Sequence, residues 1–389
     1  MKTNFYLAIK EEIEAGNLTL ICIISPARAG STLMMNVLAQ SPSIHSFINQ
    51  PFHLTYSHPY TPPISREEMA YGRIWKKYQQ VKEITNQKTV TIILKCMARN
   101  LGIGQQLLRF MGLVKTSILL IRNPVLTVES LLKAQVLVIE DMPEASPIDL
   151  EEYAAQKEVV NHIPHRSYWS ELRDFILETK RYHLISDVLA ETLAFIELNR
   201  YESTMVDDYQ RDLEVYGDRD FFALSWTGWN NMQTVYECCL VENKNYFVVD
   251  STIFRCLPEE IGQRICQKLD VVYSPHMVRN WSAINESVVD DDIIQVSWMK
   301  VCYNKVSNSL EVYPPKESPI EIDLFPDIYQ QHISETAYPN YLTMLGDRHT
   351  LRPQDRLETH MLLNIPITEN GDNLRSVDPI FTEALLSVS

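Results

Sequence analysis

Four residues close together in the chain could bind an anion: Arg28, Gly30, Ser31 and Thr32. A glycine lets the backbone approach a bound group closely, and the two hydroxyls stand beside the free N–H groups of a first helical turn. The apolar run 18–24 precedes them, and apolar residues at helical spacing follow from position 33. This order predicts a buried strand, a tight loop and a helix whose N-terminus faces a phosphate or sulfate.

The loop differs from the common nucleotide-binding loop G-x-x-x-x-G-K-[ST], because its cation stands two residues before Gly30 and no lysine precedes its hydroxyls. The order R-x-G-[ST]-T after a strand instead resembles the 5'-phosphosulfate loop of sulfotransferases that use 3'-phosphoadenosine 5'-phosphosulfate (PAPS). The resemblance implies that Arg28, Ala29, Gly30, Ser31 and Thr32 bind the 5' end of PAPS. An ordinary turn with a solvated arginine is the alternative.

A second motif follows the apolar run 117–121. Arg122 and Ser130 lie eight positions apart in R-N-P-V-L-T-V-E-S, where 125–132 has helical character. This spacing resembles the 3'-phosphate motif of the same enzymes, in which an arginine and a serine hold the dianion. A fixed guanidinium fork and a hydroxyl suit that charge. A lone R-N-P is ordinarily a surface turn, but two motifs in the right order favour the nucleotide.

The resemblance extends over roughly residues 18–345. The strand-like run 90–97 places Lys95 where the family carries a lysine close to the transferred group, and 246–249 followed by 258–269 resembles a strand and helix of bacterial sulfotransferases. It implies a P-loop-like α/β fold, with three α/β/α layers, a central parallel sheet and helical insertions. We expect helices over these ranges: 149–160, 167–181, 186–202 and 220–241.

The family's chemistry is in-line transfer of a sulfuryl group from PAPS to a hydroxyl or nitrogen of an acceptor, which releases 3'-phosphoadenosine 5'-phosphate (PAP). For this chain we expect a small-molecule acceptor such as a specialised metabolite. The protein mainly positions the reactants and stabilises charge on the leaving oxygen. The resemblance implies that Arg28 neutralises that oxygen, that Lys95 lies near the transferred group, and that Arg122 and Ser130 fix the 3'-phosphate. No metal is needed.

The general base is where the chain departs from the family. Gln50 and Met97 occupy the positions of the usual glutamate and histidine, and an amide cannot act as a base. His53, three residues after Gln50, is the titratable group closest to that position and could act as the base, but it could equally be a hydrogen-bonded histidine of the loop without a catalytic role. His45 and His58 are weaker candidates for the base. The alternatives are an acceptor that needs little base, such as an amine, or a base from the helical insert.

Composition sets limits on the whole chain of 389 residues. No linker or repeat divides it, so we expect a single domain over 1–389, with an N-terminal helix within 1–17 and an extension over 346–389. That extension could be a cap, a homo-oligomer contact or a tail. The net charge of −15 argues against a nucleic-acid partner, and no apolar run is long enough for a membrane span. Seven cysteines without a C-x-x-C pair favour free thiols and a cytoplasmic location.

Two other functions remain open at this point. A degenerate sulfotransferase fold could bind the nucleotide without turnover, which the presence of Arg28, Lys95, Arg122 and Ser130 disfavours. A small-molecule kinase is disfavoured by the missing Walker lysine and by Arg-Asn-Pro where a Mg²⁺-binding aspartate would be needed.

Overall fold

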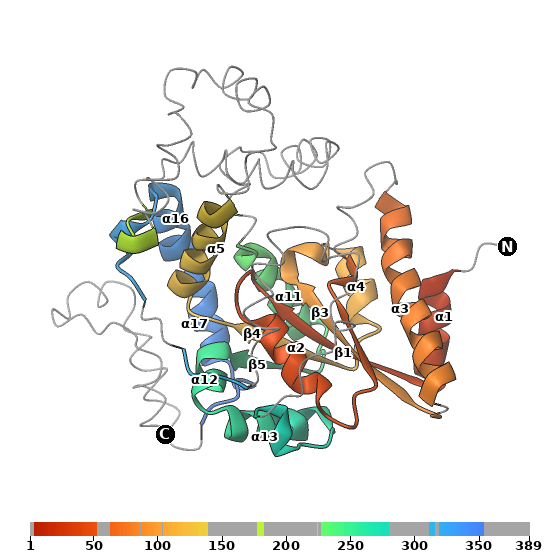
Figure 1. The fold of residues 1–389 in the computed structure, drawn as a ribbon. Coiled ribbons are helices and arrows are strands. Elements are labelled where there is room, and N and C mark those ends of the chain that lie inside the picture. Colours follow the sequence, from red (N-terminus) through yellow and green to blue (C-terminus); the bar gives the residue numbers. More distant parts are fainter. Residues whose placement is uncertain are drawn as a thin grey trace.

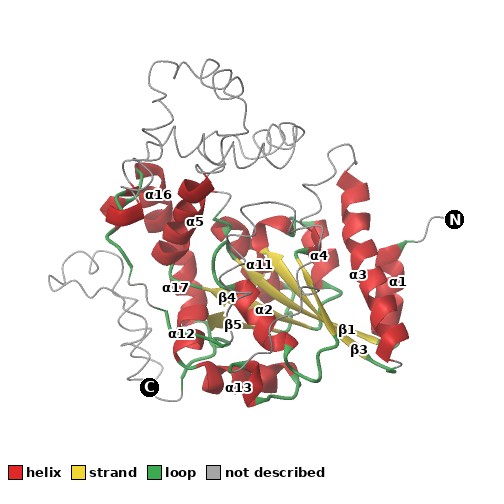
Figure 2. Cartoon of the chain, viewed as in Figure 1, coloured by secondary structure: helices red, strands yellow, loops and turns green. Residues whose placement is uncertain are grey.

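A computed structural model of the chain describes residues 4–52, 63–85, 87–102, 104–138, 177–182, 224, 227–279, 311–315 and 319–353. This part of the chain contains a five-stranded sheet in the order β2-β3-β1-β4-β5, and each neighbouring pair is parallel (Figure 2). The strands are β1 (Leu18–Ser25), β2 (Ser46–Asn49), β3 (Val90–Met97), β4 (Thr116–Ile121) and β5 (Tyr246–Asp250).

Helices cover both faces of the sheet. Successive residues of a strand point to opposite sides, so each strand contributes side chains to two cores. In β1, Leu20, Cys22 and Ile24 belong to one buried core, whereas Ile21 and Ile23 belong to the other. The first core includes side chains of α1 (Phe5–Glu14), α3 (Pro63–Thr85), α4 (Gln105–Met111), α11 (Trp229–Val241) and α17 (Tyr338–Gly346). The second includes side chains of α2 (Ser31–Ala39), α12 (Ser251–Cys256) and α13 (Pro258–Leu269). The expected three-layer α/β/α fold with a parallel sheet is therefore confirmed (Figure 1).

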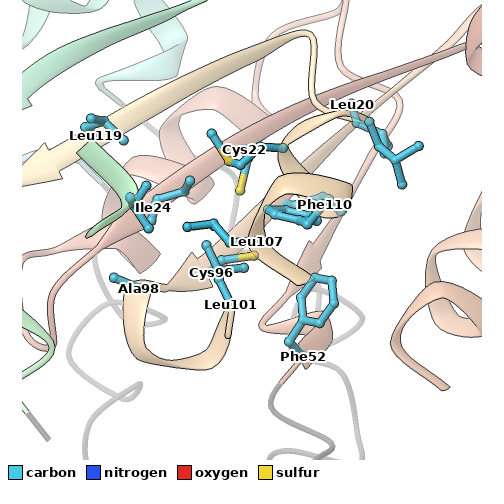
Figure 3. Close-up of a cluster of buried hydrophobic side chains, with 14 of the residues drawn as sticks. Leu20, Cys22, Ile24, Phe52, Cys96, Ala98, Leu101, Leu107, Phe110 and Leu119 are labelled. Atoms are coloured by element: carbon cyan, nitrogen blue, oxygen red, sulfur yellow. The ribbon is translucent and has the colours of Figure 1, made fainter. Parts of the chain in front are cut away.

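Burial on both faces explains why the strands read as nearly continuous apolar runs. In the first core, β1 packs against residues of β3 and α4 (Figure 3). The rings of Phe52 and Phe110 meet edge to face there, with their centroids 4.9 Å apart. Each large side chain buried in this way contributes about 1.5–3 kcal/mol.

The order of the strands determines where a ligand can bind. The chain leaves β1 toward β2 at one edge of the sheet, and it leaves β4 toward β5 at the other. Since β1 and β4 are neighbours, the loops that follow them diverge, and open α/β sheets bind ligands at such a point. The two predicted anion-binding motifs follow these two strands.

Most expected elements of the core agree with the structure. The strands expected over 18–24, 90–97, 117–121 and 246–249 are β1, β3, β4 and β5, and the helix expected over 258–269 is α13. The helix expected after β4 is present as α5 (Pro124–Val138), and the N-terminal helix as α1. The short strand β2, the long helix α3 and the helix α12 were not predicted.

One expectation about the helices was wrong, and one helical region was not predicted. A continuous helix over 220–241 is interrupted at Gly228, which has a left-handed backbone (φ 75°) and precedes the first residue of α11. The helix α16 (Asp327–His332), a π-helical turn η8 (Ile333–Ala337) and α17 follow one another directly, in a part of the chain for which no helix was predicted. The π turn shifts the helical register, which hides the 3.6-residue pattern. The helices expected over 149–160 and 186–202 lie outside the described residues, and of 167–181 only 177–181 is described, with 177–179 helical.

The C-terminal part of the described chain returns to the edge of the sheet. The backbone N–H of Val248 donates to His349 (3.2 Å), and that of Leu351 donates to Val248 (2.9 Å). Tyr236 and Tyr246 both donate to the carboxylate of Asp347, at 2.6 and 2.8 Å. The expected extension over 346–389 thus begins as a segment bound to β5, and residues after 353 lie outside the description.

No helix among the described residues combines the length and the apolar character that crossing a membrane requires. The six cysteines in the described ranges have free thiols, and Cys22, Cys96, Cys239 and Cys266 are buried.

Candidate functional site

The loop between β1 and α2 leaves the N-terminus of α2 open to a ligand. Gly30 precedes the first residue of α2 with a left-handed backbone (φ 91°), and no side chain of the described residues caps the helix. Arg28 is also left-handed (φ 61°), a conformation that costs a non-glycine residue about 1–2 kcal/mol. The first N–H groups of α2 thus lie beside the hydroxyls of Ser31 and Thr32 without a side-chain cap among the described residues, an arrangement that suits anion binding.

Two hydrogen bonds join the two predicted motifs. Arg28 Nε donates to Ser130 Oγ on α5 at 3.1 Å, across 102 positions of sequence. Arg122 Nη1 donates to the backbone oxygen of Arg28 at 3.2 Å. The structure thus brings Arg28, Arg122 and Ser130 together at the divergence of β1 and β4, and each motif uses its arginine to contact the other.

A buried carboxylate lies near Arg122. Asp250, at the end of β5, is paired in register with Ile121, the residue before Arg122. Burial raises the pKa of the Asp250 carboxyl, although hydrogen bonds from the Ile253 N–H and from Tyr341, and the charge of Arg122, oppose that shift. Asp250 was not predicted as a site residue. Its position after a buried strand was the signal that could have revealed it.

The residues that precede α11 hold the loop between β1 and α2 in place. The Ala27 N–H donates to the Thr227 oxygen at 2.9 Å, and Thr227 Oγ1 lies 2.8 Å from His332 Nε2. Burial lowers the pKa of His332 to about 4, so its ring is neutral near pH 7. A Cβ atom added at Gly228 would lie only 3.5 Å from Pro26 Cα, which shows how closely the two backbones approach. Nothing in the sequence indicated this support.

Lys95 lies near the carboxyl end of β3, as predicted, and only 4% of its surface is exposed. Its neighbours across the sheet are Ile23 of β1 and Asn49 of β2. By strand alternation its side chain points to the same face as Ile93, the face that α2 covers.

The region around Gln50 carries an amide where relatives of the predicted family carry a glutamate. Gln50 is buried with a left-handed backbone (φ 49°). Its Oε1 accepts from Asn100 Nδ2 and its backbone oxygen from Arg73 Nη1, both at 3.4 Å, while its N–H donates to the Lys95 oxygen at 2.7 Å. This side chain is thus held in place beside the strand that carries Lys95.

The histidines offered as bases have different outcomes. His53 and His58 lie outside the described residues. His45 Nδ1 accepts from the Thr91 N–H at 3.0 Å, near the start of β3 and therefore at the opposite end of that strand from Lys95. The structure does not bring His45 to the site, because four residues of extended strand span about 13 Å.

Comparisons with known proteins add no relative. No protein-family model matches the chain, and neither a curated protein nor a solved structure matches it. Among the described residues, no group of three or more His, Cys, Asp or Glu side chains gathers as a metal site would need.

Proposed function

We propose that this protein is a sulfotransferase that moves a sulfuryl group from PAPS to a hydroxyl or nitrogen of a small-molecule acceptor and releases PAP. The observation that carries the proposal is the convergence of two arginine motifs at one point of the sheet. Arg28 contacts Ser130, and Arg122 contacts the backbone of Arg28, at the carboxyl ends of neighbouring strands.

The donor groups suit a nucleotide with phosphates at both ends of its ribose. The open N-terminus of α2, with Ser31 and Thr32, would take the 5'-phosphate. Arg122 and Ser130 would take the 3'-phosphate, for which a guanidinium fork is well shaped. In a chain with a net charge of −15, such a local group of cations is what would attract this anion.

Binding would change the partner of Arg28. Its guanidinium donates to Ser130 in the structure, whereas catalysis would need it beside the leaving oxygen of the phosphosulfate. A 3'-phosphate that takes over the Ser130 hydroxyl would release Arg28 for that role. There the guanidinium would stabilise the negative charge that develops as the sulfur–oxygen bond breaks.

Lys95 and the buried Asp250 would support the reaction from either side. Lys95 points to the face that α2 covers, so its ammonium group would lie on the side of the transferred sulfuryl group. Asp250 attracts Arg122 electrostatically and would orient its fork toward the 3'-phosphate. For the acceptor's proton, His53 remains the predicted base.

Calorimetric titration with PAP, ADP and AMP tests the proposal. We expect wild type to bind PAP at least about 100-fold more tightly than AMP, since a bidentate charged contact is worth roughly 3 kcal/mol. Arg122→Ala should abolish that preference, while the control Arg109→Ala, which removes a half-exposed ion pair with Glu67 on another helix, should retain it. Equal affinities of wild type for PAP and the nucleotides without a 3'-phosphate would refute the proposal.

Nucleotide binding without turnover is the second candidate, because the amide of Gln50 stands in the place of a base. Mass spectrometry of amine and hydroxyl acceptors incubated with PAPS separates the two functions. His53→Ala should reduce turnover with hydroxyl acceptors, and full retention of activity would exclude His53 as the base. Phosphorylated products with ATP would instead indicate a kinase.

A further inference from the structure

A buried hydroxyl beside the loop lacks a hydrogen bond. Ser251, the first residue of α12, is 3% exposed, and its Oγ has no partner among the described residues. A buried polar group left in this state costs about 1–3 kcal/mol, so each such group needs an explanation, and a ligand is one.

The hydroxyl is not needed by its own helix. Asp250 caps α12, because its Oδ1 accepts from the N–H groups of Thr252 and Ile253 at 2.8 and 3.0 Å. Many serines at the start of a helix serve as caps, but here that role is already filled.

The hydroxyl lies instead against the N-terminus of a different helix. A Cβ atom added at Gly30 would lie 3.7 Å from Ser251 Cβ and 3.9 Å from its Oγ. Gly30 precedes the first residue of α2, a helix of nine residues with no side-chain cap. The Ser251 hydroxyl therefore lies beside the residue that precedes the first turn of α2, whose free N–H groups favour an anion.

We propose that Ser251 is a further binding residue of this site and donates its hydroxyl proton to an oxygen of the 5'-phosphate held at the N-terminus of α2. The inference rests on the proposed function for the identity of the nucleotide. It assigns β5 two roles: Asp250 orients the arginine for the 3' end, and the next residue binds the 5' end.

Calorimetry with three probes tests this role. The probes are PAP, 5'-AMP and 3'-AMP, of which only the last has no 5'-phosphate. Ser251→Ala should weaken binding of PAP and 5'-AMP by the same factor, about tenfold or more, because a hydrogen bond to a charged group is lost. Binding of 3'-AMP should not change.

The melting temperature without ligand distinguishes binding from a structural role. Ser251→Ala removes a buried hydroxyl that has no partner, so it should leave the melting temperature unchanged or raise it. The control Ser41→Ala removes an equally buried hydroxyl that donates to the Val272 oxygen at 2.7 Å. It should lower the melting temperature and leave the affinity for PAP unchanged.

The two proposals fail in different ways. If wild type binds PAP and 5'-AMP equally, the proposed function is wrong, while a weaker binding of 5'-AMP by Ser251→Ala would still support this inference. If Ser251→Ala and wild type bind 5'-AMP equally, the inference is overturned, whatever preference wild type shows for PAP.

Discussion

The two halves of the sheet's carboxyl edge differ in the chemistry that they present. Arg28, Arg122 and Asp250 stand at the ends of β1, β4 and β5: the Arg122 guanidinium donates to the backbone oxygen of Arg28, and the charge of Arg122 acts on the Asp250 carboxyl. At the ends of β2 and β3, Gln50 Oε1 accepts a hydrogen bond from Asn100 Nδ2. The Gln50 N–H donates to the backbone oxygen of the buried Lys95. The charged half would suit a dianionic nucleotide, whereas the amide half could orient a partner but could not take its proton.

If the proposed function is right, this difference means that nucleotide recognition and acceptor chemistry would depend on separate groups of residues. The charged half includes backbone contacts to the start of α11 as well as side chains, so its geometry is set by the core. If the halves are separate, substitutions in one should change nucleotide affinity or turnover without affecting the other.

The largest effect should follow from Arg28→Ala. We expect kcat at saturating PAPS to fall by about 100- to 1,000-fold, since removing one donor to a developing charge has that effect in other enzymes. Arg28→Lys should recover part of the loss, because it keeps the charge without the fork. Product formation by mass spectrometry gives the rates, and a loss of less than threefold would remove Arg28 from the reaction.

An effect of about 3 kcal/mol should appear in the pH dependence of stability through His332. Its pKa of about 4 in the folded protein lies below the ordinary 6.5. Between these values the unfolded chain binds a proton that the folded chain does not. The contribution of His332 to the free energy of unfolding is therefore fully present above pH 6.5 and is lost as the pH falls toward 4.

His332→Gln keeps a group that can hydrogen-bond Thr227 but cannot titrate in this range. Urea unfolding at pH 7, 6 and 5 should therefore show a shallower loss of stability in the variant than in wild type. The backbone oxygen of Thr227 also accepts from the N–H of Ala27, which belongs to the proposed nucleotide-binding loop. The affinity of wild type for PAP should therefore decline as well when the pH falls from 7 to 5. Identical slopes in both proteins would show that His332 does not titrate as its burial implies.

The smallest effect should come from the amide half. Gln50→Leu keeps the residue buried but removes the acceptor for Asn100 Nδ2. We expect kcat/KM for the acceptor to fall by about tenfold, the usual scale of one neutral hydrogen bond, with PAP affinity within about twofold of wild type. A larger change in PAP affinity than in acceptor kinetics would break the comparison between the two halves.

The sequence was sufficient to predict the strands whose apolar runs are continuous. Strands β1, β3, β4 and β5 are buried on both faces, so their composition alone identifies them. The strand β2 has four residues, too few for a pattern, and Gly228 lies inside an otherwise helical stretch that propensity alone does not divide.

The sequence predicted some residues of the candidate site but none of their contacts. Arg28, Arg122 and Ser130 were expected to serve one nucleotide, and the hydrogen bond between Arg28 and Ser130 was not foreseen. The pair Thr227–His332 spans 105 positions and carries no motif, because only the fold brings these side chains together. Local patterns specify strands and loops, whereas such distant polar contacts depend on tertiary packing.

The return of the chain to β5 also has a consequence for the behaviour of the protein at high concentration. An exposed edge strand is a template on which another molecule can add a strand and begin to aggregate. Here residues 349–351 occupy both backbone groups of Val248, in the middle of β5, and the opposite edge strand β2 has only four residues. The sheet thus offers little continuous edge for pairing with another molecule, and a chain shortened before His349 would lose that protection at β5.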